Sequence, residues 1–311
     1  MSRGRGTLFL FVMAISACSS TAPRSMCAID MGSNSFRRIV GTFAEGRYVE
    51  TAIESKTMGV GDDVEKHGRI SDAKLGEIEQ TLLAFAAACR EDGVSAPVAV
   101  GTAAFRNAPN GARAIEIASR AGVRMEIASE ERESALAYLV GSLGQAGHAV
   151  IDNGSRSIEL VAMSGGVLQH RVFNLGYRIA YEEFFARADE PAAAIAAFRA
   201  RVLHEAEQAP FMKGHSRLVG VEFMEMAEVL FEPVPDGHSY SLANLRERLD
   251  VIASTPAQFE QLKRTKDIDR ALPRLVVAVT LMERFNYPEL VLTSRQLGTG
   301  LIIEAGVRAR R

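Results

Sequence analysis

The amino-acid sequence predicts an α/β protein of two domains, each built on a mixed β-sheet with helices on its faces. Two observations support this prediction. A loop motif near the N-terminus recurs 122 residues later, where Asp152 repeats Asp30. Each copy is followed by strand-like segments and then by helices that alternate with short strands. At 311 residues the chain is long enough for two such domains.

The repeated motif joins two predicted strands. Residues 29–35 read Ile-Asp-Met-Gly-Ser-Asn-Ser, and residues 151–157 read Ile-Asp-Asn-Gly-Ser-Arg-Ser. A short apolar stretch precedes each copy, and two strand-like runs separated by a turn follow it. Each half therefore begins with three strands, the first two joined by an Asp-x-Gly-Ser loop. The strands predicted after the loops are 36–43, 47–54, 158–163 and 167–173.

The rest of each half predicts helices between short buried strands. Ser71 is a suitable N-cap for a long amphipathic helix. The predicted helices are 71–92, 130–143, 191–208, 269–285 and one that begins near Gly300. The predicted strands are 97–101, 123–127, 218–221 and 290–292.

The position of the repeat sets the expected domain boundaries. We expect a leader and tether at 1–26, a first domain at 27–147 and a second domain at 148–311. The two domains should meet near His148, and the cleft between them should hold both loops.

Composition argues against several classes of function. The net charge is −2, so no nucleic-acid partner is expected. The sequence contains no Cys-x-x-Cys, so a zinc site is not expected. The sequence is 47% hydrophobic and 24% charged, which is ordinary for a globular protein.

The N-terminus has the pattern of a bacterial lipoprotein leader. Arg3 and Arg5 precede an apolar run at 8–15, which is too short to span a bilayer. The run ends in Ile-Ser-Ala-Cys at 15–18, a lipobox-like sequence, and a polar tether follows. We therefore expect a lipid anchor at Cys18 and a location on the periplasmic side of a bacterial membrane. The alternative is a chain that starts at Met26 and stays in the cytoplasm.

Two cysteines follow the tether. Export would place Cys27 and Cys89 in an oxidising compartment, where a disulfide is possible. The sequence leaves their pairing open, and two buried thiols are slightly favoured.

The two loops are suited to phosphate. A turn rich in glycine and serine presents backbone N–H groups and hydroxyls at one point, and such a concavity binds anions. An aspartate at the end of the preceding strand can hold Mg²⁺ or orient a water molecule. Two such loops facing one cleft can hold a phosphorylated ligand from both sides.

Residues 28–36 resemble the opening signature of the exopolyphosphatase/guanosine pentaphosphate phosphohydrolase family. Residues 100–106, 127–139 and 150–160 resemble further segments of that family in the same order. The resemblance covers residues 27–305. It implies two ribonuclease-H-like domains with a cleft between them, the architecture shared by actin-like ATPases, sugar kinases and Hsp70.

The resemblance also implies hydrolysis of terminal phosphoanhydride bonds with Mg²⁺ and water. It implies that Glu133 activates the attacking water, that Arg106 neutralises phosphate charge, and that the acidic positions near the metal are Asp30, Asp152 and Glu159. The ligand expected is polyphosphate or another phosphorylated small molecule, and a homodimer is a further expectation. The residues expected to bind phosphate are Gly32, Ser33, Asn34, Ser35, Gly154, Ser155, Arg156 and Ser157.

The second half departs from the family pattern. Ser155 and Arg156 stand where the family has glycines, although Arg156 can supply a positive charge to phosphate. Residues 219–223 lack the family's Ser-Gly-Thr, and Glu222 there would repel a phosphate. Residues 293–300 lack the family's Asp-Gly pair and have no arginine at the position where the family has one. Whether the chain is an enzyme is therefore left open, and the alternative is a non-catalytic protein that binds or senses a phosphorylated ligand.

Overall fold

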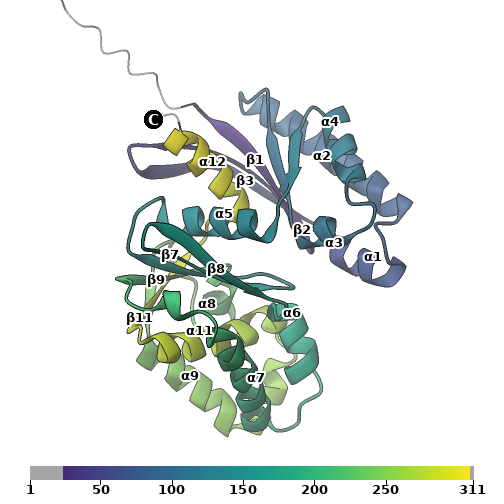
Figure 1. Cartoon of the computed structure of the whole chain (residues 1–311). Helices are drawn as coiled ribbons and strands as arrows, with labels where there is room; N and C mark the ends of the chain where they lie inside the picture. Colours follow the sequence, from purple (N-terminus) through teal and green to yellow (C-terminus); the bar gives the residue numbers. More distant parts are fainter. Residues whose placement is uncertain (1–23, 309–311) are drawn as a thin grey trace, which may run out of the picture.

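The computed structural model describes residues 24–308, which form two β-sheets with helices packed against them (Figure 1). The first sheet has the strand order β3-β2-β1-β4-β5. In it β1, β2 and β3 are antiparallel neighbours, whereas β4 and β5 continue the sheet parallel to β1. Its strands are β1 Met26–Met31, β2 Ser35–Ala44, β3 Arg47–Thr57, β4 Val98–Gly101 and β5 Arg124–Ile127.

The second sheet repeats this plan and adds an edge strand, giving the order β10-β11-β9-β6-β7-β8. Strands β6, β7 and β8 are antiparallel, β9 and β11 run parallel to β6, and β10 is antiparallel to β11. These pairings confirm the predicted duplication of three strands followed by parallel ones. The strands are β6 His148–Asn153, β7 Ile158–Ser164, β8 Val167–Phe173, β9 Arg217–Val221, β10 Ser239–Ser241 and β11 Glu289–Thr293.

The helices of the first half cover both faces of its sheet. The side chain of Ser71 caps α2 by accepting a hydrogen bond from the Lys74 N–H, as the sequence predicts. An apolar core joins α1, α2, α3 and α4 to one face of the sheet. These helices are α1 Val60–His67, α2 Asp72–Glu91, α3 Ala103–Asn107 and α4 Arg113–Arg120. Of these, only α2 was predicted, because the other three have at most eight residues and give a weak periodic signal.

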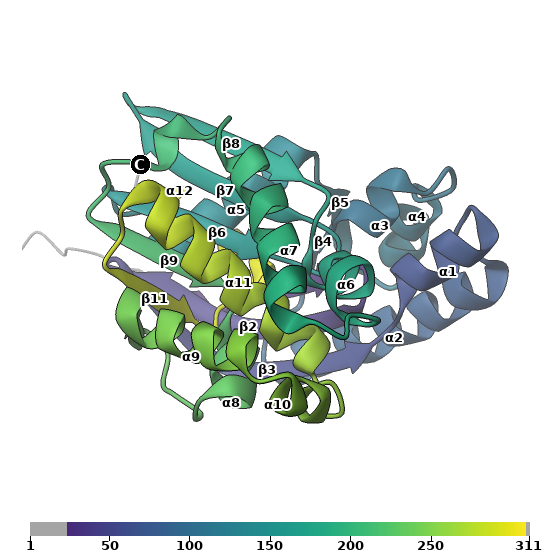
Figure 2. The same cartoon turned by 90° about the horizontal axis from the view of Figure 1, so that it is seen from below.

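The helices of the second half form one thick layer, and Figure 2 shows α7, α9 and α11 lying over the second sheet. The largest apolar core lies between this layer and the sheet. The helices are α6 Tyr177–Ala180, a π-turn Tyr181–Phe185, α7 Pro191–Ala206, a 3₁₀ turn Pro210–Met212, α8 Met224–Leu230, α9 Leu242–Ser254, α10 Pro256–Leu262 and α11 Ile268–Phe285.

Helix α5, Glu130–Ser142, packs between the two sheets (Figure 1). Leu136 and Ala137 belong to an apolar cluster with strands of the first sheet. Tyr138 and Val140 belong to a cluster with strands of the second. Gly141 permits this close contact, because a Cβ there would lie 2.6 Å from a methyl carbon of the second sheet. The helix is therefore fixed from both sides.

The last helix, α12 Leu297–Arg308, lies with the first sheet although it follows the second in sequence. Its apolar residues pack with Ile39 and Phe43 of β2 and with Leu136 of α5. A helix beginning near Gly300 was predicted, but it begins three residues earlier, at Leu297. A Cβ at Gly300 would lie 2.9 Å from the Leu136 carbonyl oxygen, so glycine here serves close helix packing instead of marking a boundary. The predicted domain boundary at residue 148 remains a prediction. It would assign α12 to the second domain, whereas α12 packs on the first sheet.

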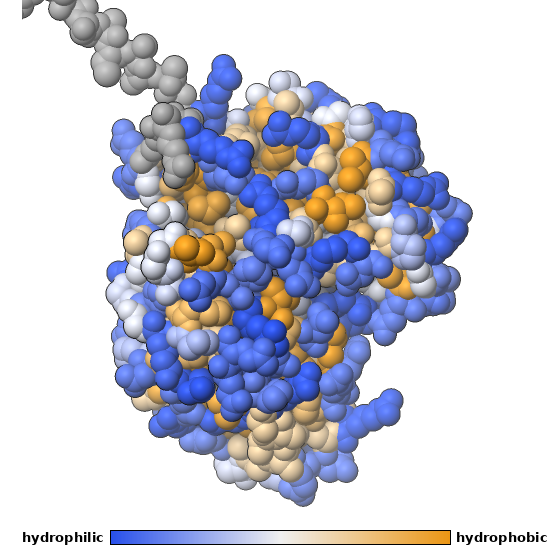
Figure 3. Space-filling model, viewed as in Figure 1, coloured by the Kyte–Doolittle hydropathy of each residue, from blue (hydrophilic) through white to orange (hydrophobic). Residues whose placement is uncertain are grey.

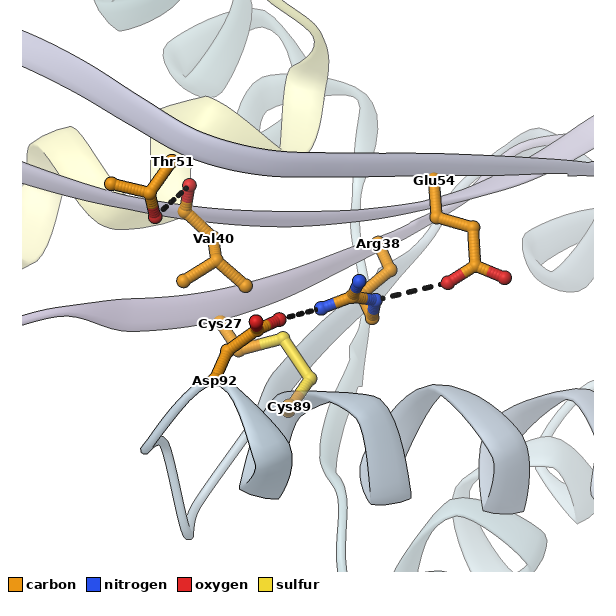
Figure 4. The surroundings of a disulfide bond; sticks show 7 residues. All are labelled: Cys27, Arg38, Val40, Thr51, Glu54, Cys89 and Asp92. Atoms are coloured by element: carbon orange, nitrogen blue, oxygen red, sulfur yellow. Dashed lines mark hydrogen bonds and ion pairs between the residues drawn. A yellow bond between two sulfur atoms is a disulfide. The ribbon is translucent and has the colours of Figure 1, made fainter.

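A disulfide joins Cys27 of β1 to Cys89 in the last turn of α2 (Figure 4). The sequence slightly favoured two unpaired thiols at Cys27 and Cys89, and this expectation is wrong. Packing of α2 on the sheet brings the two Cα atoms to 5.9 Å, a normal separation for a disulfide. Beside it, Arg38 of β2 pairs with Asp92 just after α2 and with Glu54 of β3, so charge reinforces the covalent link.

The face seen in Figure 3 is largely hydrophilic, with apolar residues in patches between polar ones. Within residues 24–308 no helix has the length and apolar character needed to cross a membrane. The predicted signal peptide and the anchor at Cys18 lie outside the described residues.

We expect the paired change Cys27→Ala and Cys89→Ala to lower the free energy of unfolding by about 2–4 kcal/mol, because the bond closes a loop across 62 residues in the unfolded chain. Urea unfolding measures this. The difference should shrink when both proteins are unfolded in strong reductant. Equal midpoints under oxidising conditions would contradict the prediction.

Candidate active site

Both loops line one cavity of about 90 Å³ between the two halves of the molecule. The sequence therefore predicted correctly that the loops face each other across a cleft. Every predicted site residue except Arg106 contributes to the wall. Those residues are Asp30, Gly32, Ser33, Asn34, Ser35, Glu133, Asp152, Gly154, Ser155, Arg156, Ser157 and Glu159.

Each loop is held by the segment that follows its three strands. In the first loop the carbonyls of Ser33 and Asn34 accept hydrogen bonds from the N–H groups of Gly61 and Gly59. In the second loop the carbonyls of Gly154 and Ser155 accept from Tyr177 and Arg178.

The loop carbonyls are therefore occupied, whereas the loop amides stay available. Within residues 24–308, the N–H groups of Ser33, Asn34, Ser155 and Arg156 donate to no protein acceptor. Free amides beside hydroxyl side chains are what an anion site requires.

Glu133 enters the cavity from the first turn of α5. The Ser129 side chain caps this helix by accepting from the Arg132 N–H. The Glu133 side chain is 11% exposed and accepts a hydrogen bond from Arg106 at 2.8 Å. Burial raises the pKa of Glu133, and the charge of Arg106 opposes that rise only in part.

Arg106 lies on α3 and supports Glu133 from outside the cavity wall. The same guanidinium nitrogen donates to Glu133 and, at 2.9 Å, to the Ala128 carbonyl oxygen. Arg106 therefore fixes the carboxylate to the end of the loop that precedes α5.

Three further buried carboxylates share the cavity. Burial raises the pKa of Asp30 to about 7, with Arg37 opposing the shift. Burial and repulsion from Glu133 raise the pKa of Glu159 to about 8. Burial, with repulsion led by Glu159, raises the pKa of Asp152 well above its ordinary range. Asp152 and Glu159 are direct cross-strand partners on β6 and β7, which accounts for their proximity.

The far wall of the cavity carries residues that the sequence analysis did not assign to a site. Glu222, which follows β9, accepts from Arg37 of β2 at 2.6 Å and from Arg274 of α11 at 3.4 Å. Arg274 is fully buried and also pairs with Glu225 at 2.7 Å. Burial on its own disfavours the charged form of Glu222, but Arg37 and Arg274 keep its pKa below the ordinary value.

Tyr177 completes this wall, since its ring centre lies 4.5 Å from the Arg274 guanidinium carbon. These residues come from four separate segments, so no local motif marks them. The single sequence signal was Glu222, recognised as a departure from a phosphate-binding segment.

Arg156, expected to contact phosphate, reaches across the mouth of the cavity to α1. Its guanidinium donates to Glu65 at 2.6 Å and lies 3.7 Å from Asp62. Arg178 pairs with the same Asp62. The second loop is thus tied to the first half of the molecule by ion pairs at the rim.

Comparison with known proteins shows which family this chain resembles. The model of the Ppx/GppA phosphatase family matches residues 44–238. The structure of the Aquifex aeolicus member of that family is similar over 92% of this chain and 99% of its own, with a TM-score of 0.77 and 20% identity. An exopolyphosphatase from Cytophaga hutchinsonii matches 92% of this chain and 98% of its own, with a TM-score of 0.74 and 17% identity.

An exopolyphosphatase-like protein matches 92% of this chain and all of its own, with a TM-score of 0.72 and 22% identity. The search of curated proteins gave no significant match. The structural likeness confirms the predicted actin-like, two-domain fold.

We expect Glu133→Gln to raise the melting temperature relative to the wild type increasingly as pH rises. Because the folded-state pKa of Glu133 lies above its ordinary value of 4.5, its contribution to stability is present at low pH and is lost as pH rises through the folded pKa. Glutamine does not titrate. Thermal unfolding across the pH range measures the difference between the two proteins.

Glu131→Gln is the matched control, because Glu131 lies on the same helical turn, is exposed, and has a lowered pKa owing to hydrogen bonds at the helix start. The melting temperature of Glu131→Gln relative to the wild type should not rise with pH. A constant difference between Glu133→Gln and wild type at every pH would contradict the prediction.

Proposed function

The chain belongs to the Ppx/GppA phosphatase family, and on this premise we propose that it hydrolyses terminal phosphoanhydride bonds, with water activated by Glu133. Polyphosphate or a similar phosphorylated small molecule is the proposed substrate. The observation that carries the proposal is the position of Glu133. It is a buried carboxylate of raised pKa, held by Arg106, in a cavity that both anion-binding loops line.

The raised pKa of Glu133 suits a general base. A base works best when its pKa approaches the working pH, because it then accepts a proton readily while a useful fraction stays ionised. Arg106 orients the carboxylate by its hydrogen bond at 2.8 Å. The free amides of the two loops are placed to receive the oxygens of a terminal phosphate. Because α5 is packed between the two sheets, the Glu133 carboxylate keeps a fixed position relative to both loops.

The donor set fits Mg²⁺. Within residues 24–308 no three His, Cys, Asp or Glu side chains are grouped so as to hold a metal unaided. Mg²⁺ usually takes one or two carboxylates and completes its shell with water and substrate phosphate oxygens. Asp30, Asp152 and Glu159 line the cavity, and one or two of these carboxylates, together with water and substrate oxygens, would hold the ion. When bound, Mg²⁺ neutralises phosphate charge and the crowded carboxylates together.

A second candidate function is binding or sensing without turnover. It is favoured by the ion pairs in the cavity, since Arg37 and Arg156 already bond to Glu222 and Glu65. These arginines are not available to phosphate unless their carboxylate partners move.

We expect Mg²⁺-dependent release of phosphate from polyphosphate by the purified protein, and a loss of about a hundredfold or more in Glu133→Gln, because a general base contributes roughly 10²–10⁴-fold. Glu131→Gln should keep the wild-type rate, since that exposed side chain lies outside the cavity. Colorimetric phosphate release measures all three proteins.

Two outcomes would contradict the proposal. Equal rates in Glu133→Gln and wild type would remove Glu133 from the chemistry. Thermal stabilisation of the wild type by polyphosphate without any phosphate release would favour the binding protein.

We also propose that the mature protein is held by a lipid at Cys18 on the periplasmic side of a bacterial membrane. The lipobox-like sequence before Cys18 motivates this location. The buried Cys27–Cys89 disulfide supports it, because structural disulfides persist mainly in oxidising compartments.

Expression of the full chain in a Gram-negative host with radiolabelled palmitate should label the wild type, and Cys18→Ala should abolish the label. An unlabelled wild-type protein that begins at Met26 would refute the anchor and indicate the cytoplasmic alternative.

A further inference from the structure

Glu222 stands in an unusual backbone conformation at the edge of the cavity. Its φ is +69°, in the left-handed region that favours glycine. Leu143 and Asn286 share this sign of φ at the C-caps of helices, where the left-handed conformation is common. Glu222 instead follows strand β9, whose last residue, Val221, pairs with Asp152. A strained residue of this kind at a site points to a functional constraint.

The Glu222 carboxylate occupies a position suited to a substrate oxyanion. Arg37 lines the cavity, and its guanidinium donates to Glu222 at 2.6 Å. Arginine in a phosphate cavity ordinarily binds phosphate oxygens in this charge-assisted way. Arg274, buried behind Glu222, donates to the other carboxylate oxygen at 3.4 Å. Glu222 therefore takes hydrogen bonds from both arginines, and Arg37, which lines the cavity, is not available to a phosphate group while this bond is made.

The remaining charges of the cavity leave no substitute for Arg37. Six acidic residues line it against three arginines. Of these arginines, Arg270 faces Glu225 at 3.4 Å and Arg156 bonds to Glu65. A terminal phosphate can use the loop amides near Glu133, but the next phosphate of a chain would meet carboxylates at the far wall.

We propose that Glu222 is a specificity residue: it holds the Arg37 guanidinium, so that the phosphate next to the terminal phosphoryl group gains no contact with Arg37 and chains of adjacent phosphates bind weakly. This inference rests on the proposed function, since it concerns the substrate class of the same cavity. Glycine at this position relieves the left-handed φ and frees Arg37. Arg37 is then available to bind the second phosphate.

The test compares the affinities of orthophosphate and tripolyphosphate by calorimetry, in buffer containing Mg²⁺. All proteins carry Glu133→Gln, so that turnover does not intervene. Adding Glu222→Gly should tighten tripolyphosphate binding about tenfold or more, as one new charge-assisted contact would, and leave orthophosphate binding nearly unchanged. Adding Arg37→Gln as well should abolish the gain, because Arg37 is its source.

A second variant at the same position is tested in case Glu222→Gly does not fold. Glu222→Gln removes the charge, keeps the side-chain size, and should shift the ratio of affinities in the same direction. Glu131→Gln removes an equal charge from an exposed position outside the cavity and leaves the Arg37–Glu222 pair intact, so the ratio should stay at the starting value.

Three results would overturn the inference: an unchanged ratio in both Glu222 variants, a gain that persists without Arg37, or an absence of tripolyphosphate binding in the folded Glu222→Gly variant. Failure of the proposed hydrolysis would instead be seen in the phosphate-release assay, where the protein with Glu133 intact would release no phosphate.

Discussion

The packing of α5 between the two sheets is the constraint on which the site depends. One side of the helix contacts the first sheet and α12, and the other contacts strands of the second sheet. Because both loops stand at the ends of strands in these sheets, the helix fixes the distance between them as well as its own first turn. Gly141 and Gly300 permit the close contacts on its two sides. Glu133 thus reaches the cavity from a rigid support, as a precisely placed reactive group requires.

The cost of this arrangement is electrostatic. Burial of Asp30, Glu133, Asp152 and Glu159 in one cavity raises the pKa of each of them. Isolated buried carboxylates are unfavourable when ionised, so the site is stabilised by partners that carry positive charge. Arg106 supplies part of that charge, and a divalent ion supplies the rest in our proposal. The free cavity is therefore the strained part of an otherwise well-packed molecule.

Features encoded locally could be predicted from the sequence. The two Asp-x-Gly-Ser loops and Glu133 were identified from their own segments, and the structure brings them to one cavity. Features that depend on distant segments could not. The ion pair of Arg37 with Glu222 joins residues 185 positions apart, and α12 packs on the first sheet although the whole second half precedes it in the sequence. The ion pairs of Arg156 with carboxylates of α1 could not be predicted either, because a loop motif does not show which segment lies opposite it.

The central claim is that the two loops receive one phosphate group between them. A crystal structure of the protein grown with Mg²⁺ and soaked in tungstate, a heavy analogue of phosphate, tests it most directly. The account predicts one tungstate within hydrogen-bond distance of amides from both loops, at Ser33–Asn34 and Ser155–Arg156, with Glu133 facing it. A tungstate bound by one loop only, or bound outside the cavity, would contradict the account.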